Sequence, residues 1–112
     1  WTGPKMIREW QRQRGTKVDG FLSGQTAYNK AHVLERVEGG CVKAGTSGSA
    51  LGISIQKLVG VDPDGHLGSG TVTVLQIWLK ARGFYSGKID GHYGPATSRG
   101  VGLALEAKLF QK

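Results

Sequence analysis

Aspartate and histidine are the residues of this chain that could do chemistry, because paired carboxylates serve as general acid and base and histidines bind zinc. Asp64 and Asp90 each open an Asp-Gly-His sequence, so His66 and His92 hold equivalent places. Equivalent places in two separate turns should direct these side chains apart, which disfavours a carboxylate pair. The histidines lack zinc-site spacing, and Cys41 is the only cysteine. We therefore expect no catalysis, no metal and no cofactor in this chain.

The Asp-Gly pairs belong to an eight-residue turn segment that occurs three times. The first turn segment is 19–26 (DGFLSGQT), the second is 64–71 (DGHLGSGT) and the third is 90–97 (DGHYGPAT). Each one follows a helix-like stretch that carries a glutamine, at Gln11, Gln56 and Gln76. A repeated unit usually means stacked supersecondary modules, which tend to present a surface. The repetition therefore favours binding over catalysis.

Each position of the turn segment has an expected structural role. Asp before Gly is typical of an Asx turn, in which the side chain accepts from backbone N–H groups further along. The glycine provides a positive φ that other residues resist. The fourth residue, which is Leu22, Leu67 or Tyr93, is expected to be an apolar plug. The fifth residue, which is Ser23, Gly68 or Gly94, is expected to be a helix N-cap. Thr26, Thr71 and Thr97 are expected in the first helical turn.

Apolar residues at three- and four-residue spacing predict an all-α fold of tandem helix-turn-helix units, with about five helices and no substantial sheet. The helices are expected at about 4–14, 24–36, 50–59, 71–82 and 95–109.

Glycine and serine are frequent in residues 39–49, which predicts a linker between a first unit, 1–38, and a second part, 50–112. The second and third turn segments begin only 26 residues apart (90 − 64), against 45 (64 − 19) for the first and second. The shorter step leaves room for one helix. The helix at 71–82 should therefore close the second unit and open the third, which makes 50–112 one interlocked body.

Composition narrows the class of partner. The 112 residues carry a net charge of +7, which favours polyanions such as nucleic acid, anionic lipid or an anionic wall polymer. No apolar run is long enough for a membrane span, so no membrane partner is expected. The chain begins at Trp1 rather than Met, so we expect a piece of a longer protein.

One stretch of the chain resembles a known family. Residues 75–97 read LQIWLKARGFYSGKIDGHYGPAT, which is similar to the peptidoglycan-binding domain 1 pattern of a Leu-Gln helix, a Gly-Tyr-Tyr-like step and Asp-Gly-x-Phe/Tyr-Gly-Pro-x-Thr. Residues 55–71 resemble a short form of this repeat, and 7–26 resemble a more divergent copy. The whole arrangement resembles the C-terminal cell-wall-binding region of a bacteriophage endolysin.

The resemblance implies a helical module without catalysis of its own. Such a module binds peptidoglycan and targets an attached lytic enzyme, whose catalytic domain would lie upstream in the same chain. A phage lysin is made in the cytoplasm of its bacterial host and acts at the cell wall. The chain departs from the family pattern at Ser23-Gly24, which replace Gly-Pro, and at 104–106, where Ala-Leu-Glu replaces Leu-Gln or Phe-Gln. A fourth repeat is therefore not expected.

If the resemblance holds, the contacts with the wall should come from polar and aromatic residues at the turns and nearby helix ends. Aromatic faces suit sugar rings, and arginine suits carboxylates. Tyr85 and Tyr93 also suit packing, and Asp90 suits the turn itself. The candidate ligand-binding residues are His66, Tyr85, Asp90, His92, Tyr93 and Arg99.

The alternative function is binding of nucleic acid by a basic helix-turn-helix domain. Arg8, Arg12, Arg14 and Lys17 could form a stripe that contacts phosphates. The turns here are longer than those of DNA-reading motifs, and the basic residues are spread along the chain. These two features disfavour nucleic acid as the partner.

Overall fold

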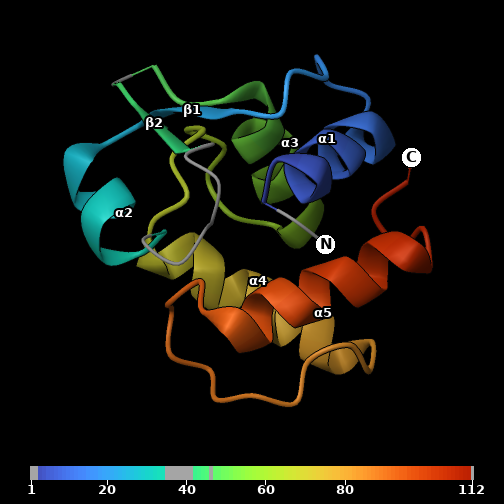
Figure 1. Cartoon of the computed structure of the whole chain (residues 1–112). Helices are drawn as coiled ribbons and strands as arrows, with labels where there is room; N and C mark the ends of the chain where they lie inside the picture. Colours follow the sequence, from blue (N-terminus) through green and yellow to red (C-terminus); the bar gives the residue numbers. More distant parts are fainter. Residues whose placement is uncertain (1–2, 35–41, 46, 112) are drawn as a thin grey trace.

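The computed structural model describes residues 3–34, 42–45 and 47–111, which form five helices and two short strands (Figure 1). In chain order the elements are α1 (Gly3–Arg14), β1 (Leu22–Gln25), α2 (Ala27–His32), β2 (Val42–Ala44), α3 (Ala50–Val59), α4 (Ser69–Ala81) and α5 (Pro95–Glu106). The expectation of a mainly helical chain with five helices is confirmed. Helical periodicity also located α3 to the residue and placed the start of α5 at Pro95.

The expectation of an all-α fold is wrong in one respect, because β1 and β2 pair as a small parallel sheet. The helix expected at 24–36 is in fact β1 followed by the short α2. Gly24 has a φ of +66°, which a helix does not permit, and Thr26 begins α2 by accepting a hydrogen bond from the backbone N–H of Asn29. Residues 35 and 36 of the expected helix lie outside the described residues.

Glycines let three backbone segments approach one another closely above α3. A Cβ atom on Gly24 would lie 2.4 Å from the carbonyl oxygen of Gly48, and one on Gly48 would lie 2.5 Å from that of Asp64. The described part of the expected linker therefore packs against the second turn segment and supplies β2. The division into units 1–38, 39–49 and 50–112 stays a prediction, and residues 35–41 and 46 lie outside the described part of the chain.

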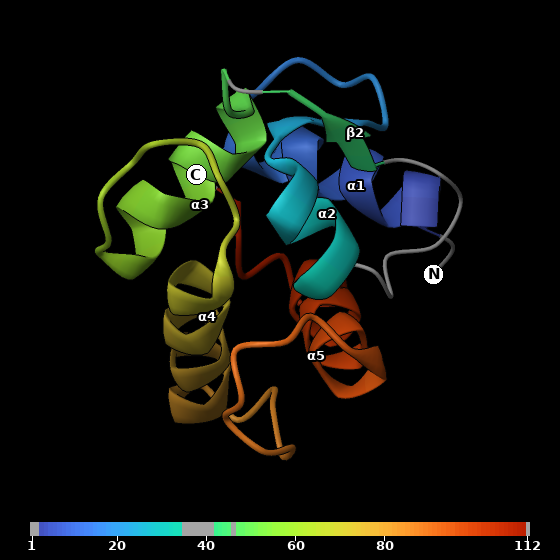
Figure 2. The ribbon, with the colours of Figure 1, turned by 90° about the vertical axis from the view of Figure 1, so that its left-hand side faces the viewer.

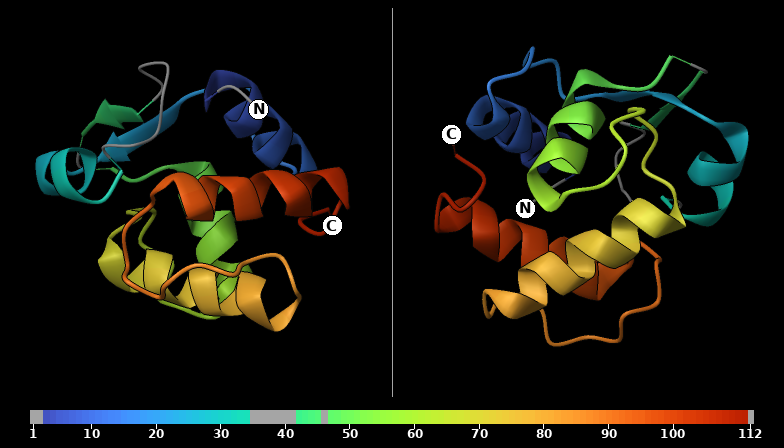
Figure 3. Two further views of the ribbon diagram at one scale, coloured as in Figure 1. Left: turned by 60° about the horizontal axis from the view of Figure 1, so that its bottom comes forward. Right: turned by 180° about the vertical axis from the view of Figure 1, so that it is seen from behind.

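A single apolar core joins the helices. Trp10 of α1 and Trp78 of α4 both contact Phe110, with ring centroids 5.2 and 5.3 Å apart respectively. Helix α1 packs against α3 and α5, and α4 packs against α3 and α5. Figure 2 and Figure 3 show α4 and α5 side by side, joined by the long loop that leads to the third turn segment. Helix α4 therefore contacts both its neighbours, whereas the interpretation as tandem repeats stays a prediction.

Among the described residues, no helix is both long and apolar enough to cross a membrane.

Candidate ligand-binding site

A buried glutamine holds the third turn segment together. The side chain of Gln76 is 0% exposed, and its Nε2 donates to Asp90 Oδ1 at 3.0 Å, to the carbonyl oxygen of His92 at 3.1 Å and to Thr97 Oγ1 at 2.9 Å. Its Oε1 accepts from the backbone N–H groups of Asp90 and Gly91, both at 3.1 Å. The Gln76 side chain on α4 thus holds the turn that leads into α5.

A glutamine also binds each of the other two turn segments, although Gln11 forms no hydrogen bond with Thr26. Gln56 donates to Asp64 Oδ1, to the His66 carbonyl oxygen and to Thr71 Oγ1, and accepts from the N–H of Gly65. Gln11 donates to Asp19 Oδ1 and accepts from the N–H groups of Asp19 and Gly20. Sequence reasoning noticed that a glutamine precedes each turn segment but gave these glutamines no role, although their regular placement was the available signal.

The Asx turns are confirmed. Oδ1 of Asp64 accepts from the N–H of His66 at 2.9 Å, and Oδ1 of Asp90 accepts from that of His92 at 3.0 Å. These backbone hydrogen bonds, followed by those from the glutamines, lower the pKa of both carboxyl groups below the ordinary value. Both aspartates are therefore ionised near neutral pH, a state unsuited to a general acid.

The other expectations for the turn segments hold in the second and third but only partly in the first. Gly20, Gly65 and Gly91 all have positive φ, and the plugs Leu22, Leu67 and Tyr93 are all buried. Gly68 and Gly94 are N-caps as expected. Ser23 is not an N-cap, because it lies within β1 and Thr26 caps α2 instead. The departure from Gly-Pro at Ser23-Gly24 thus coincides with the strand that replaces the expected helix.

The third turn segment differs from the second in the loop that precedes it. Gln76 and Asp90 are 14 residues apart, whereas Gln56 and Asp64 are 8 apart. Two of the six additional residues lengthen the helix, and the other four lengthen the loop, which spans 82–89 before the third turn segment and 60–63 before the second. Because the glutamine and its partners are equivalent in both cases, the longer loop must project away from the shared framework.

This loop and the first turns of α5 enclose a groove of about 420 Å³, here called the third-turn groove. Its lining residues are Gly83, Phe84, Tyr85, Ser86, Gly87, Pro95, Ala96, Arg99 and Leu103. Tyr85 is mostly buried, and its hydroxyl donates to the backbone carbonyl oxygen of Lys88. A Cβ atom on Gly87 would lie 2.8 Å from the Tyr85 hydroxyl, so the glycine makes room for this ring.

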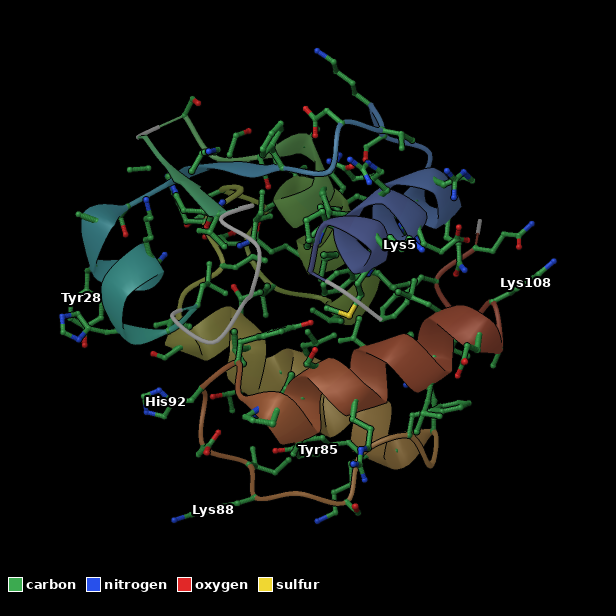
Figure 4. All side chains as sticks on the ribbon, viewed as in Figure 1. Lys5, Tyr28, Tyr85, Lys88, His92 and Lys108 are labelled. Atoms are coloured by element: carbon green, nitrogen blue, oxygen red, sulfur yellow. The ribbon has the colours of Figure 1, made fainter. Side chains whose placement is uncertain are left out.

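Arg99 is the charged residue of the third-turn groove. Its side chain is exposed and forms no hydrogen bond or ion pair with any described residue. Figure 4 shows Tyr85 directed toward α5 and Lys88 directed away from the loop. The groove therefore combines aromatic surface with an unpaired guanidinium, which suits a ligand with apolar faces and a carboxylate.

The six predicted site residues do not converge. Tyr85 and Arg99 line the third-turn groove. Asp90 is bound within its turn, and Tyr93 lies in the core with its ring 6.5 Å from that of Trp10. His92 is exposed, with Nδ1 3.2 Å from the carbonyl oxygen of His32, and His66 is half-buried in the second turn segment.

Sequence reasoning missed several residues of the groove, namely Phe84, Ser86, Pro95, Ala96 and Leu103. The signal that could have found Phe84 and Ser86 is the greater spacing between Gln76 and Asp90 than between Gln56 and Asp64. Leu103 and Pro95 are recognisable only once α5 is seen to turn one face toward the loop.

Two alternative kinds of site are a metal site and a phosphate-contacting stripe of basic residues, and the described residues form neither. No group of three or more His, Cys, Asp and Glu in this part of the chain lies close enough to hold a metal ion. The expected phosphate-contacting stripe is also broken. Arg14 is only 8% exposed and donates to Ser54 Oγ at 2.7 Å and to the Phe110 carbonyl oxygen at 3.1 Å, while Arg12 forms an ion pair with Glu9.

Residues 69–102 match the model of a family described as a putative peptidoglycan binding domain. A search of curated proteins and a search of solved structures gave no match. The matched residues comprise α4, the third turn segment and most of α5, and thus nearly the whole third-turn groove. The match supports a peptidoglycan-binding domain in this part of the chain, with peptidoglycan as the partner, the cell wall as the place of action, and binding rather than catalysis as the activity.

Proposed function

We propose that this chain binds bacterial peptidoglycan through the third-turn groove and brings an attached lytic enzyme to its substrate, as the wall-binding part of a phage endolysin does. The observation that carries the proposal is that eight of the nine groove residues lie within the segment that matches the family model. The segment thus supplies both the fold and an unpaired arginine in a concave site.

The chemistry of the groove fits a wall fragment. The ring of Phe84 is half-buried and offers apolar surface to a sugar ring or a peptide methyl group. Arg99 can donate two parallel hydrogen bonds to a carboxylate of the peptide part. The Phe84 N–H donates to the Leu79 carbonyl oxygen, Arg99 lies within α5, and Gln76 holds the turn between them before any ligand arrives, which reduces the ordering cost of binding.

The three turn segments, taken as tandem repeats, would give the chain more than one place to contact a repeating polymer. Two weak sites held close together bind such a polymer more tightly than either does alone. The net charge of +7 adds attraction to anionic wall polymers, and this contribution weakens as salt is raised.

Co-sedimentation of the chain with purified sacculi tests the proposal. The sacculi are used before and after removal of anionic secondary polymers, in low and in moderate salt. Retention on stripped sacculi in moderate salt is the expected result, since the groove recognises peptidoglycan itself. Binding that disappears after stripping would assign the interaction to charge alone. Failure to bind any sacculus would contradict the proposal, and a mobility-shift assay would then test nucleic acid.

The targeting role is tested separately by fusing the chain to a fluorescent protein. The fusion is expected to label the walls of bacteria made permeable from outside, and the fluorescent protein alone is not. Equal labelling by both proteins would contradict targeting.

A further inference from the structure

A second cavity lies at the opposite end of the sequence from the third-turn groove. It has a volume of about 240 Å³ and lies between the end of α1, the first turn segment and the start of α3. This first-turn cavity is lined by Gln11, Thr16, Lys17, Asp19, Phe21, Ser23, Ser49, Ala50 and Leu51. None of these residues belongs to the segment that matches the family model.

Two residues of opposite charge, Lys17 and Asp19, line this cavity, and both are exposed. Lys17 forms no hydrogen bond or ion pair with a described residue, so its three donors are available. The hydroxyl group of Ser23 is exposed beside them. A dipolar ligand would pair with both charges, whereas a polyanion would be repelled by Asp19.

An exposed aromatic ring completes the cavity. Phe21 is 44% exposed, and the Lys43 ammonium lies 5.0 Å from the centroid of its ring. Phe21 holds the third position of the first turn segment, where the second and third segments have His66 and His92. The side chain plays no part in the hydrogen bonds of the turn, which use its backbone groups. Because the hydrogen bonds of the turn do not involve the Phe21 side chain, this exposed ring is available for apolar contact with a partner.

We propose that the first-turn cavity is a second wall-binding site, which takes the peptide part of peptidoglycan: a short peptide with free carboxylate and ammonium groups. Lys17 pairs with a carboxylate, and Phe21 covers the aliphatic stem of the ligand. Asp19 pairs with an ammonium group through Oδ2, because its Oδ1 already accepts from Gln11 Nε2 and from the Phe21 N–H. The cavity is smaller than a typical small-molecule pocket of about 300–1,000 Å³, which fits a peptide segment rather than a full disaccharide. This inference rests on the proposed function and extends it, since two separate sites make the chain bivalent for one polymer.

The test is an amide NMR titration of the 112-residue chain with two soluble probes. The first probe is a sugar-free synthetic tetrapeptide, Ala-D-Glu-Lys-D-Ala, and the second is a disaccharide-peptide fragment of peptidoglycan. The tetrapeptide is expected to shift the amide signals of residues 16–23 and 49–51. We expect Lys17→Ala and Phe21→Ala each to weaken this binding about fivefold, a size typical of one exposed ion pair or aromatic contact.

The matched controls are Lys57→Ala, which removes one exposed positive charge from α3, and Val18→Ala, which trims an exposed side chain next to Lys17 that does not line the cavity. Both are expected to bind the tetrapeptide as the parent chain does, and the amide spectra of all four variants report whether each one is folded. The inference is wrong if the tetrapeptide leaves residues 16–23 and 49–51 unshifted, or if Lys17→Ala and Phe21→Ala bind like their controls.

The second probe separates this inference from the proposed function. If the disaccharide-peptide shifts residues 83–103 while neither probe shifts 16–23, the inference fails and the proposed function stands. If neither probe shifts any residue at either place, both fail.

Discussion

The second and third turn segments share a framework and differ in their surroundings. In both, a buried glutamine binds an aspartate, a histidine carbonyl oxygen and a threonine hydroxyl through equivalent atoms. The second turn segment is enclosed: Gln25 of β1 donates to the Gly65 carbonyl oxygen at 2.9 Å and accepts from the Leu67 N–H at 2.8 Å. Gly65 and Leu67 of this segment are therefore used for packing within the molecule.

The third turn segment contacts the end of α2 instead of β1. The Tyr93 N–H donates to the Val33 carbonyl oxygen, just beyond the end of α2. The loop that precedes the segment lies at the surface and lines the third-turn groove. The glutamine and its partners therefore determine the shape of both turn segments, whereas the longer loop before the third turn segment creates the site. Substitutions in the shared framework should thus change stability in both segments, and substitutions in the loop and groove should change binding alone.

The largest expected effect comes from removing the glutamines. Gln56→Ala leaves the Gly65 N–H without its acceptor, Gln76→Ala does so for the Asp90 and Gly91 N–H groups, and each also removes the donor to three oxygen atoms of its turn segment. We expect each substitution to lower the free energy of unfolding by about 3 kcal/mol or more. Urea unfolding of both variants measures the loss. The comparison predicts similar losses, so a variant that lost less than about 1 kcal/mol would show that its glutamine does not organise the turn.

Substitution of a glycine in either turn segment should cost less stability than loss of a glutamine, and the cost should differ between the two segments. Gly65→Ala and Gly91→Ala both place a side chain at positive φ, a strain of about 1–2 kcal/mol. A Cβ atom on Gly65 would also lie 2.8 Å from Gly48 Cα, whereas one on Gly91 would meet the Thr73 hydroxyl at 2.9 Å and the Ser69 carbonyl oxygen at 3.0 Å. Because the threonine side chain can rotate away, thermal unfolding should show the larger loss for Gly65→Ala. The reverse order would contradict the enclosed position of the second turn segment.

Acid should affect both segments in the same direction. The folded-state pKa values of Asp64 and Asp90 lie below the ordinary value of 3.8, so the stability that these carboxylates contribute is present above that value and is lost as the pH falls through the folded pKa. Asp64→Asn and Asp90→Asn keep an oxygen that accepts the same hydrogen bonds but does not titrate. We expect the unfolding temperature of each variant to fall less steeply between pH 5 and pH 2 than that of the parent chain. An unchanged slope would show that these groups are not the ones that titrate.

The bounds of α3, the start of α5 and most roles in the turn segments could be predicted from the sequence because they depend on local features, whereas α4 begins two residues earlier and α5 ends three residues earlier than expected. Apolar spacing determines α3, Pro95 begins α5, and the Asp-Gly pairs determine the Asx turns. The small sheet could not be predicted in this way. It depends on the approach of Gly24 to Gly48, two residues that are far apart in the sequence.

The candidate site was only partly predictable for a related reason. Tyr85 and Arg99 are an aromatic and a charged residue near a turn, as predicted for a binding site, and both line the groove. His66, His92 and Tyr93 met the same criterion, but position within the turn segment does not reveal which face the rest of the chain covers. Arg14 shows the same limit, since its burial against Ser54 and Phe110 depends on the packing of α1 against α3 and α5.

The most direct test of the third-turn groove compares Arg99→Ala with Lys88→Ala in binding to stripped sacculi at moderate salt. Both variants remove one exposed positive charge from the same region, but Arg99 lines the groove and the Lys88 side chain points away from it (Figure 4). Both should unfold like the parent chain. We predict that Arg99→Ala weakens binding about tenfold, as expected for the loss of a charge-assisted hydrogen bond, and that Lys88→Ala does not. Equal binding by the two variants would contradict the assignment of the third-turn groove as the peptidoglycan site.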